Sequence, residues 1–143
     1  MTKPLSPSLE DYLEAAYTLS LKDGAARASA VSRLLKVSKP SVNSAVKALA
    51  ARGLLSQERY GSIRLTPAGA RAGAEIAGRH VTLKAFFTEV LALDPARAEA
   101  DACRAEHALS PEALRRVGAL TLFLKGRPGA LKAARAALAR RPA

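Results

Sequence analysis

Aromatic side chains are scarce in this sequence. Phe, Trp and Tyr together make up 4% of the residues and tryptophan is absent, although 49% of the residues are hydrophobic. That hydrophobic content is ample for a folded protein, so the core must be built from Ala, Leu and Val, as is typical of helix-rich proteins. We therefore expect a mainly α fold, and 143 residues suit one domain or two small ones.

Cysteine occurs only once, and long apolar runs are missing. The single cysteine, Cys103, cannot form an internal disulfide, which agrees with a reducing compartment and leaves a thiol for other chemistry. No segment approaches the roughly 20 apolar residues needed to span a bilayer, and the polar N-terminus does not read as a secretory leader. These absences favour a soluble, cytoplasmic protein.

Acidic residues are few. The chain has 12 Asp and Glu against 23 Lys and Arg, a formal net charge of +11, and this excess predicts a polyanionic partner such as nucleic acid. Between Gly24 and Gln57 there are six basic residues and no acidic one. The carboxylates gather near residues 10–14 and 94–112, where they could hold a cation, although acids also suit the first turns of helices.

The first half of the chain predicts a helix-turn-helix. After a helix over residues 8–22, with Ser8 in a capping box, the spacing of apolar residues predicts short helices over 27–35 and from Ser38 onward. Ser38 is a good N-cap and Pro40 suits the first turn. The second helix would present small polar and basic side chains, which can reach base edges in the major groove. An ordinary helical hairpin is the alternative.

A short hairpin is predicted directly after these helices. Residues 54–65 alternate apolar and polar side chains around a turn at Tyr60-Gly61. Following a helix-turn-helix, such a hairpin makes a winged helix, and its basic residues could contact phosphates beside the groove. We place this DNA-binding domain at residues 1–70. The predicted DNA-binding residues are Arg27, Ser38, Lys39, Pro40, Ser41, Asn43, Ser44, Lys47, Arg59, Tyr60 and Arg64.

The second half, residues 71–143, is predicted to be helical. One long helix runs from Thr66-Pro67 to about Leu91, and further helices begin at Asp94-Pro95 and Ser110-Pro111. The last of these carries more apolar residues than so short a chain can bury, which indicates a dimer interface. That apolar stripe comprises Leu114, Val117, Leu120, Leu122 and Leu124. A basic terminal helix follows the loop at 126–129.

The stretch from Asp101 to His107 carries the most distinctive chemistry, because it contains the only cysteine and one of the two histidines. On a helix, Cys103, Glu106 and His107 would share one face, so a thiolate, a carboxylate and an imidazole would form half of a metal site. The other donors must come from elsewhere, and His80 is the first candidate. The alternative is a buried cysteine beside a solvated Glu-His pair.

These motifs occur in an order that resembles the diphtheria toxin repressor family over nearly the whole chain. The matching segments are residues 8–17 (SLEDYLEAAY), 37–42 (VSKPSV), Leu65-Thr66, Arg79-His80 and 103–107 (CRAEH). The short length is similar to the manganese transport regulator branch, which lacks the extra C-terminal SH3-like domain. The resemblance implies a winged helix joined to a helical metal-binding and dimerisation domain. It also implies a homodimer that represses metal-uptake genes from a palindromic operator when metal is bound.

The resemblance also implies a ligand set. Its members are Asp11, Glu14, His80, Cys103, Glu106 and His107. The set is a hybrid, because the manganese branch usually has a bridging glutamate in place of Cys103, whereas the iron-dependent branch has methionine in place of Asp11. Lys84 stands where the family often has an acid, so one ion per subunit is expected rather than two. Carboxylates and imidazoles favour Mn²⁺ or Fe²⁺, while the thiolate also accepts Zn²⁺ or Co²⁺.

The sequence can be compared with two alternative functions. A metal-independent, basic architectural DNA-binding protein would use the same positive charge, with the acids as mere surface charge. A hydrolytic metalloenzyme lacks support, because the sequence has no zinc-protease histidine pair and no nucleophile elbow. The sequence therefore predicts a DNA-binding regulator that responds to Mn²⁺ or Fe²⁺, and not an enzyme.

Overall fold

The computed structural model describes residues 3–140, and the chain divides into two compact units. One unit extends to Ala77 and the other begins at Gly78. The boundary falls inside the long helix α4 (Pro67–Ala85), which contributes its first part to one unit and its last part to the other. No helix in the described part of the chain is long and apolar enough to cross a membrane.

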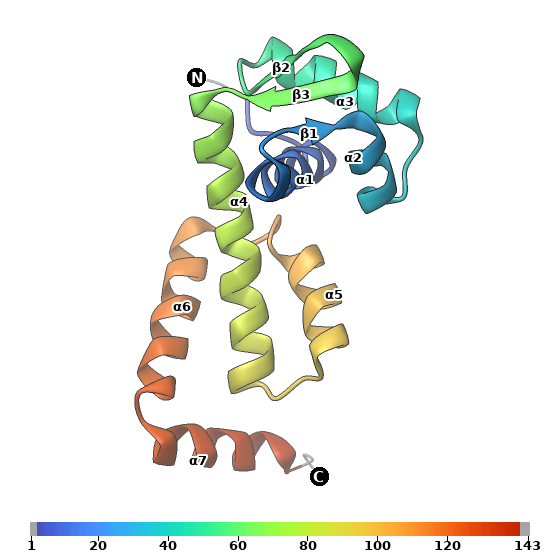
Figure 1. The fold of residues 1–143 in the computed structure, drawn as a ribbon. Helices are drawn as coiled ribbons and strands as arrows, with labels where there is room; N and C mark the ends of the chain where they lie inside the picture. The colour runs from blue at the N-terminus through green and yellow to red at the C-terminus, as the bar shows by residue number, and fades with distance from the viewer. Residues whose placement is uncertain (1–2, 141–143) are drawn as a thin grey trace. The chain divides into compact units, whose positions relative to one another are not determined.

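The first unit combines three helices, the start of α4 and a small sheet (Figure 1). Its helices are α1 (Pro7–Asp23), α2 (Ala28–Leu35) and α3 (Lys39–Ala51). Its strands are β1 (Ala26–Arg27), β2 (Leu55–Gln57) and β3 (Ser62–Leu65), antiparallel in the order β1-β3-β2, with the 3-10 turn η1 (Arg59–Gly61) before β3. This arrangement confirms the predicted winged helix-turn-helix.

The core of the first unit is aliphatic, as the composition predicts. Its largest fully buried side chains include Leu13 on α1, Val42 and Leu49 on α3, Ile63 on β3 and Ile76 on α4. Because these residues come from all parts of the unit, burying them fixes the helices and the sheet together. The core therefore holds α3 in place while the opposite face of α3 remains exposed.

Local capping signals explain where the helices begin and end. The Ser38 hydroxyl accepts from the N–H of Ser41 at 3.3 Å and caps α3, as predicted. At the start of α1 the prediction was wrong, because Ser6 rather than Ser8 is the N-cap, and Pro7 occupies the first turn. Gly24 ends α1 in the left-handed region, with φ of 81°.

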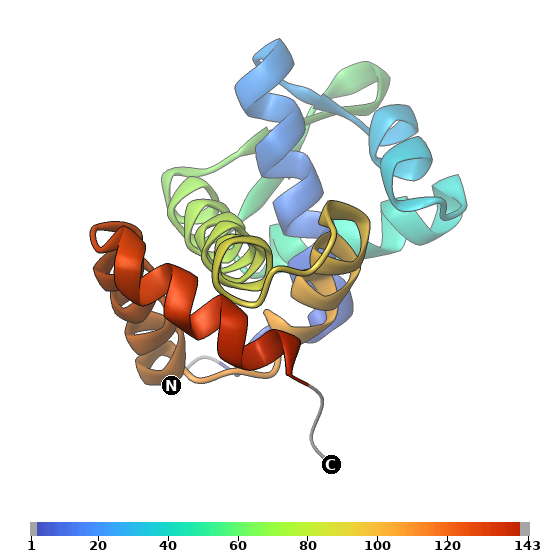
Figure 2. The ribbon, with the colours of Figure 1, turned by 90° about the horizontal axis from the view of Figure 1, so that it is seen from below.

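The second unit is entirely helical in its described part. The last part of α4 continues into a π-helical turn, η2 (Phe86–Val90), and is followed by α5 (Pro95–Ala105), α6 (Pro111–Lys125) and α7 (Pro128–Ala139). Figures 1 and 2 show α5 and α6 on different sides of this end of α4. A small core joins the three helices. It consists of Leu83, Ala102 and Leu114, with Phe87, Ala105 and Val117 packed against it.

The apolar stripe predicted on α6 divides between two faces. Leu114 is buried in the core of the unit and Val117 packs against that core. Leu120 and Leu122 are instead 48% and 73% exposed, together with Phe123 at 50%. The second unit therefore uses part of the stripe internally and leaves the rest as an exposed apolar surface on α6.

Candidate metal centre and nucleic-acid interface

The end of α5 brings Cys103 and Glu106 to one site. The helix ends at Ala105, so Glu106 is its C-cap and His107 lies in the following turn, rather than all three residues lying inside one helix. Glu106 nevertheless keeps helical backbone angles (φ −60°, ψ −26°), and its N–H donates to the carbonyl of Ala102 at 3.0 Å. The expected spacing of one turn between Cys103 and Glu106 is therefore retained.

Glu106 is the buried centre of this site, with 1% of its surface exposed. Its Oε2 lies 2.8 Å from Nδ1 of His80, and its Oε1 lies 3.5 Å from Nε2 of His107. The Glu106 backbone carbonyl accepts from the Arg79 guanidinium at 3.2 Å. Because an unpaired buried carboxylate is costly, the two imidazoles are what make this burial tolerable.

The thiol of Cys103 faces the same imidazole nitrogen. Its Sγ lies 3.9 Å from Nδ1 of His80, and the thiol is exposed to solvent. A thiolate, a carboxylate and an imidazole nitrogen therefore converge from α4 and α5. This mixture of soft and hard donors suits a divalent transition metal such as Fe²⁺, Co²⁺, Zn²⁺ or Mn²⁺.

Sequence reasoning missed Glu99 at this site, and it noted Lys84 only as a cation in place of a family acid, without its contact to Glu99. Glu99 on α5 places Oε1 3.0 Å from Nε2 of His80 and Oε2 3.0 Å from Nζ of Lys84 on α4. The donor atoms of His80, Glu99 and Cys103 also lie within 4.8 Å of one another. A helical-face reading could have found both residues, because Lys84 is four residues after His80 and Glu99 is four before Cys103.

Electrostatics favours a proton on His80 when no metal is bound. Burial alone would lower the pKa of His80, but hydrogen bonds to Glu99 and Glu106 and the charges of both carboxylates outweigh it and raise that pKa. The pKa of Glu99 is lowered, first by its hydrogen bond from Lys84 and then by that from His80. The contacts of the ring with these two carboxylates therefore favour its protonated form.

The two remaining predicted ligands, Asp11 and Glu14, belong to the first unit. Both lie on α1, where Asp11 is exposed and Glu14 is half-buried. They are three positions apart on the helix, so they share one helical face, as expected. Their role as ligands stays a prediction.

The exposed face of α3 is the candidate nucleic-acid interface. Lys39, Ser41, Asn43 and Lys47 are all exposed, whereas the opposite face of the helix is buried in the core. Pro40 and Ser44 are exposed on the same helix. Ser38 is also exposed, but its hydroxyl is engaged in capping and lies 2.8 Å from the hydroxyl of Ser41. Side chains on this face are therefore small or basic, as a groove-binding helix requires.

The remaining predicted DNA contacts lie on β1 and the wing. Arg27, Arg59 and Arg64 are exposed, and Arg64 forms a salt bridge across the hairpin with Glu58, 3.0 Å between Nε and Oε1. The side chain of Tyr60 lies outside the described part of the structure. The exposed arginines are suited to phosphate contacts beside a groove.

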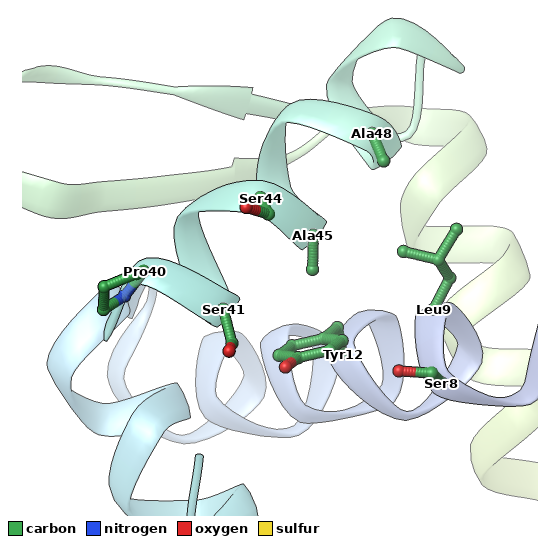
Figure 3. Close-up of a pocket in the computed structure, with 8 residues that line it drawn as sticks. All are labelled: Ser8, Leu9, Tyr12, Pro40, Ser41, Ser44, Ala45 and Ala48. Carbon is green, nitrogen blue, oxygen red and sulfur yellow. The ribbon is translucent and has the colours of Figure 1, made fainter. Parts of the chain in front are cut away.

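Two hollows border α3. The larger, about 470 Å³, lies between α1 and α3, and Figure 3 shows Tyr12 of α1 beside Ser41 of α3. It is shallow and uncharged because Ser and Ala line α3 there. Its lining residues are Ser8, Leu9, Tyr12, Pro40, Ser41, Ser44, Ala45 and Ala48. The smaller hollow, about 260 Å³, has two cations, Arg27 and Lys39, together with Asn43 and Gly61 in its lining, which suits a phosphate group.

Comparison with known proteins places this architecture in a family. The model of the N-terminal DNA binding domain of iron-dependent repressors matches residues 4–63, and that of their metal binding and dimerisation domain matches residues 66–132. The HTH-type transcriptional regulator MntR of Listeria monocytogenes is 34% identical over 96% of this chain and 96% of its own length. An uncharacterised HTH-type regulator of Methanocaldococcus jannaschii is 36% identical over 79% of this chain and 91% of its own length.

Solved structures agree in fold. IdeR of T. acidophilum has a TM-score of 0.71 and 26% identity over 87% of this chain and 56% of its own. A manganese-dependent transcriptional repressor in complex with manganese has a TM-score of 0.71 and 25% identity over 80% of this chain and 53% of its own. This chain thus spans about half the length of the solved structures that it matches. From the matched domains and the full-length relatives, the chain belongs to the iron-dependent repressor family of DNA-binding transcriptional regulators.

Proposed function

We propose that this protein represses metal-uptake genes when Mn²⁺ occupies the site around Glu106, with Fe²⁺ as the alternative ion. The observation that supports it best is the carboxylate of Glu106, buried to 1% exposure between two imidazoles. Buried acid and histidine clusters in a fold with a metal-binding domain are typical of ion sites. No group in the described residues calls for a catalytic role, and the relatives are regulators rather than enzymes.

The ligands of the ion would come first from the second unit. His80, Cys103, Glu106 and His107 would supply nitrogen, sulfur and oxygen donors. Asp11 and Glu14 complete the proposed set through the family resemblance. Mn²⁺ is favoured by the carboxylates and by the manganese regulators among the similar solved structures, whereas Cys103 favours Fe²⁺. The bound ion would act as a structural crosslink and would have no catalytic role.

Regulation would follow from which residues the ion joins. If donors of α1 and donors of the second unit bind one ion, metal binding restricts how the DNA-binding unit is held. The ion then shifts the population toward the DNA-competent arrangement by no more than its differential affinity for the two states. In a symmetric dimer, the recognition helices α3 must match successive major grooves about 34 Å apart.

A homodimer supplies the second recognition helix. The metal binding and dimerisation domain matched at residues 66–132 includes the exposed apolar surface of Leu120, Leu122 and Phe123. Apolar side chains so exposed are suited to burial against a second copy. The dimer would bind a palindromic operator through two copies of α3.

DNA binding in the presence of metal and of chelator tests the proposal. Fluorescence anisotropy with a palindromic operator, selected from random DNA by the Mn²⁺-loaded protein, should give much tighter binding with Mn²⁺ than with chelator. His80→Ala should bind weakly in both conditions. Equal affinity in both conditions, with a steep dependence on salt and no sequence preference, would contradict metal control and support the architectural alternative.

A further inference from the structure

The imidazole of His80 lies between two carboxylates, and each carboxylate contacts a different ring nitrogen. Nδ1 lies 2.8 Å from Oε2 of Glu106 and 3.9 Å from Sγ of Cys103. Nε2 lies 3.0 Å from Oε1 of Glu99. Nδ1 therefore faces both the thiol of Cys103 and the buried carboxylate of Glu106. Nε2 faces the carboxylate of Glu99 instead.

Glu99 differs from Glu106 because it is already paired with a cation. Its Oε2 lies 3.0 Å from Nζ of Lys84, while its Oε1 is on His80. Both carboxylate oxygens therefore have a hydrogen-bond donor. Lys84 lies one turn after His80 on α4, so the helix itself positions the ammonium and the imidazole to share this carboxylate.

This pairing selects one tautomer of His80 once a metal binds. Glu99, held at its other oxygen by Lys84, is placed to accept a hydrogen bond from Nε2, as outer carboxylates do for metal-bound imidazoles. The lone pair is then left on Nδ1, which faces Glu106 and Cys103.

The same pairing discourages an ion on the Nε2 side. A cation there would need the carboxylate of Glu99, whose charge Lys84 already neutralises, and it would lie close to the ammonium. Like charges at such distances repel, and the side chain of Lys84 is only partly exposed, so solvent screens the repulsion incompletely.

We propose that Lys84 and Glu99 are positioning residues that hold the Nε2 proton of His80, so that each subunit takes a single ion, at Nδ1. The proposal deepens the proposed function and rests on it, because it assumes that the ion binds at this cluster. Lys84 and Glu99 lie outside the predicted ligand set, yet they would control how many ions bind and through which nitrogen of His80.

The ion count is the first test. Full-length protein is titrated with Mn²⁺ by calorimetry and the bound metal is measured by mass spectrometry. The wild type should bind one ion per subunit. Lys84→Glu, which adds a carboxylate beside Glu99, should bind two, whereas Lys84→Arg should bind one. Two ions in the wild type, or one ion in a folded Lys84→Glu variant, would overturn the proposal.

The ring nitrogen is the second test, and its first arm needs no variant. In Zn²⁺-loaded wild type, chosen because Zn²⁺ is diamagnetic, ¹⁵N NMR of the His80 ring should show a protonated Nε2 and metal on Nδ1. Metal on Nε2, as in an ion held by Glu99 and Cys103, would overturn the proposal. Glu99→Ala should lower Mn²⁺ affinity about 10- to 100-fold and mix the tautomers, and Glu99→Asp should restore part of both.

These outcomes separate the two levels of inference. A wild type that binds no Mn²⁺, Fe²⁺ or Zn²⁺ contradicts the proposed function as well as the positioning role. A wild type that binds metal through Nε2, or binds two ions, contradicts the positioning role alone. A single ion at Nδ1, together with a second ion gained in Lys84→Glu, supports both.

Discussion

Nδ1 of His80 and Oε2 of Glu106 lie 2.8 Å apart, although 26 residues separate them in the chain. The contact joins the last part of α4 to the end of α5, the same two helices that share the small core of Leu83 and Ala102. Packing thus holds the imidazole and the carboxylate in place before any ion binds, so less ordering remains to be done when it does.

We expect Glu106→Gln to weaken Mn²⁺ binding by about 100-fold or more, because the amide keeps the shape but removes a charged donor; loss of even an outer partner costs 10- to 100-fold. Calorimetry on the metal-free variant measures the affinity. Glu112→Gln is the matched control, since it makes the same change in charge on exposed α6, where Glu112 pairs with Arg115 and Arg116. Equal losses in the two variants would contradict a specific role for Glu106.

Metal affinity should fall as the pH is lowered. The proton on Nδ1 competes with the ion, and the pKa of His80 is raised above 6.5, so the competition begins at a higher pH than for an ordinary histidine. Without metal the sign is opposite. The protonated ring stabilises the fold below the unfolded pKa, and this stabilisation is lost as the pH rises through the raised folded pKa.

The measurement is Mn²⁺ affinity and unfolding temperature between about pH 6 and pH 8, the range in which a histidine near its ordinary pKa titrates. The stabilisation by Mn²⁺ should increase with pH, while the stability of the metal-free protein should decline slightly over the same range. In His80→Gln both trends should flatten. An affinity for Mn²⁺ that does not change with pH would show that no titrating imidazole takes part.

Local signals made much of the fold predictable. Ser38 and Pro40 lie within three residues of each other, at the helix start that they specify, so α3 and its exposed face could be placed without the structure. The strand β1 could not, because Ala26–Arg27 is too short for any alternating pattern and exists only through its pairing with β3. Ser6 was missed as a cap because Ser8 offers an equally good local signal.

The candidate site shows the same division between local and distant information. Cys103, Glu106 and His107 lie within five residues, so their grouping could be predicted locally, although His107 lies in the turn after α5 rather than on the helix. The role of Glu99 depends on two residues of another helix, and no local pattern records which helices pack together. The burial of the α6 stripe could not be predicted locally either. Leu114 and Leu122 are both leucines of the same stripe, but only Leu114 is buried.

Substitutions on α3 should separate base contacts from phosphate contacts. Asn43→Ala should cost about 1–3 kcal/mol and relax sequence preference, because an amide reads a base edge. Lys39→Ala should weaken binding to all sequences similarly and reduce the slope of log affinity against log salt by about 1. Lys132→Ala on α7 makes the same change in charge as Lys39→Ala and should alter neither. Fluorescence anisotropy with operator and mutated operator measures both effects.

Leu122→Glu should weaken the dimer, because it places a charge in the exposed apolar surface of α6. The side chain of Leu122 is 73% exposed in the single chain. Sedimentation velocity across protein concentrations measures the dissociation, and the variant should lose affinity for the palindrome more than for a half-site. Leu21→Glu is a suitable control, because Leu21 is 71% exposed on α1, outside the dimerisation domain. A dimer that is unchanged in Leu122→Glu would place the interface elsewhere.

Two glycines of α4 should respond in opposite directions to alanine. The N–H of Gly69 donates to Thr66 Oγ1 at 3.0 Å, and a Cβ on Gly69 would overlap the carbonyl of Leu54, a backbone group that cannot rotate away. Gly69→Ala should therefore destabilise the protein by about 1–3 kcal/mol. Gly78→Ala meets nothing within 4 Å and should stabilise it by up to about 1 kcal/mol through helix propensity.

Because both glycines lie in the same helix, the gain in propensity is common to the two variants, and their difference isolates the clash with Leu54. Urea unfolding of the metal-free protein, followed by circular dichroism, measures the change in free energy. If the two substitutions shifted the urea midpoint equally, the close approach of Gly69 to the Leu54 carbonyl would not be part of the folded unit.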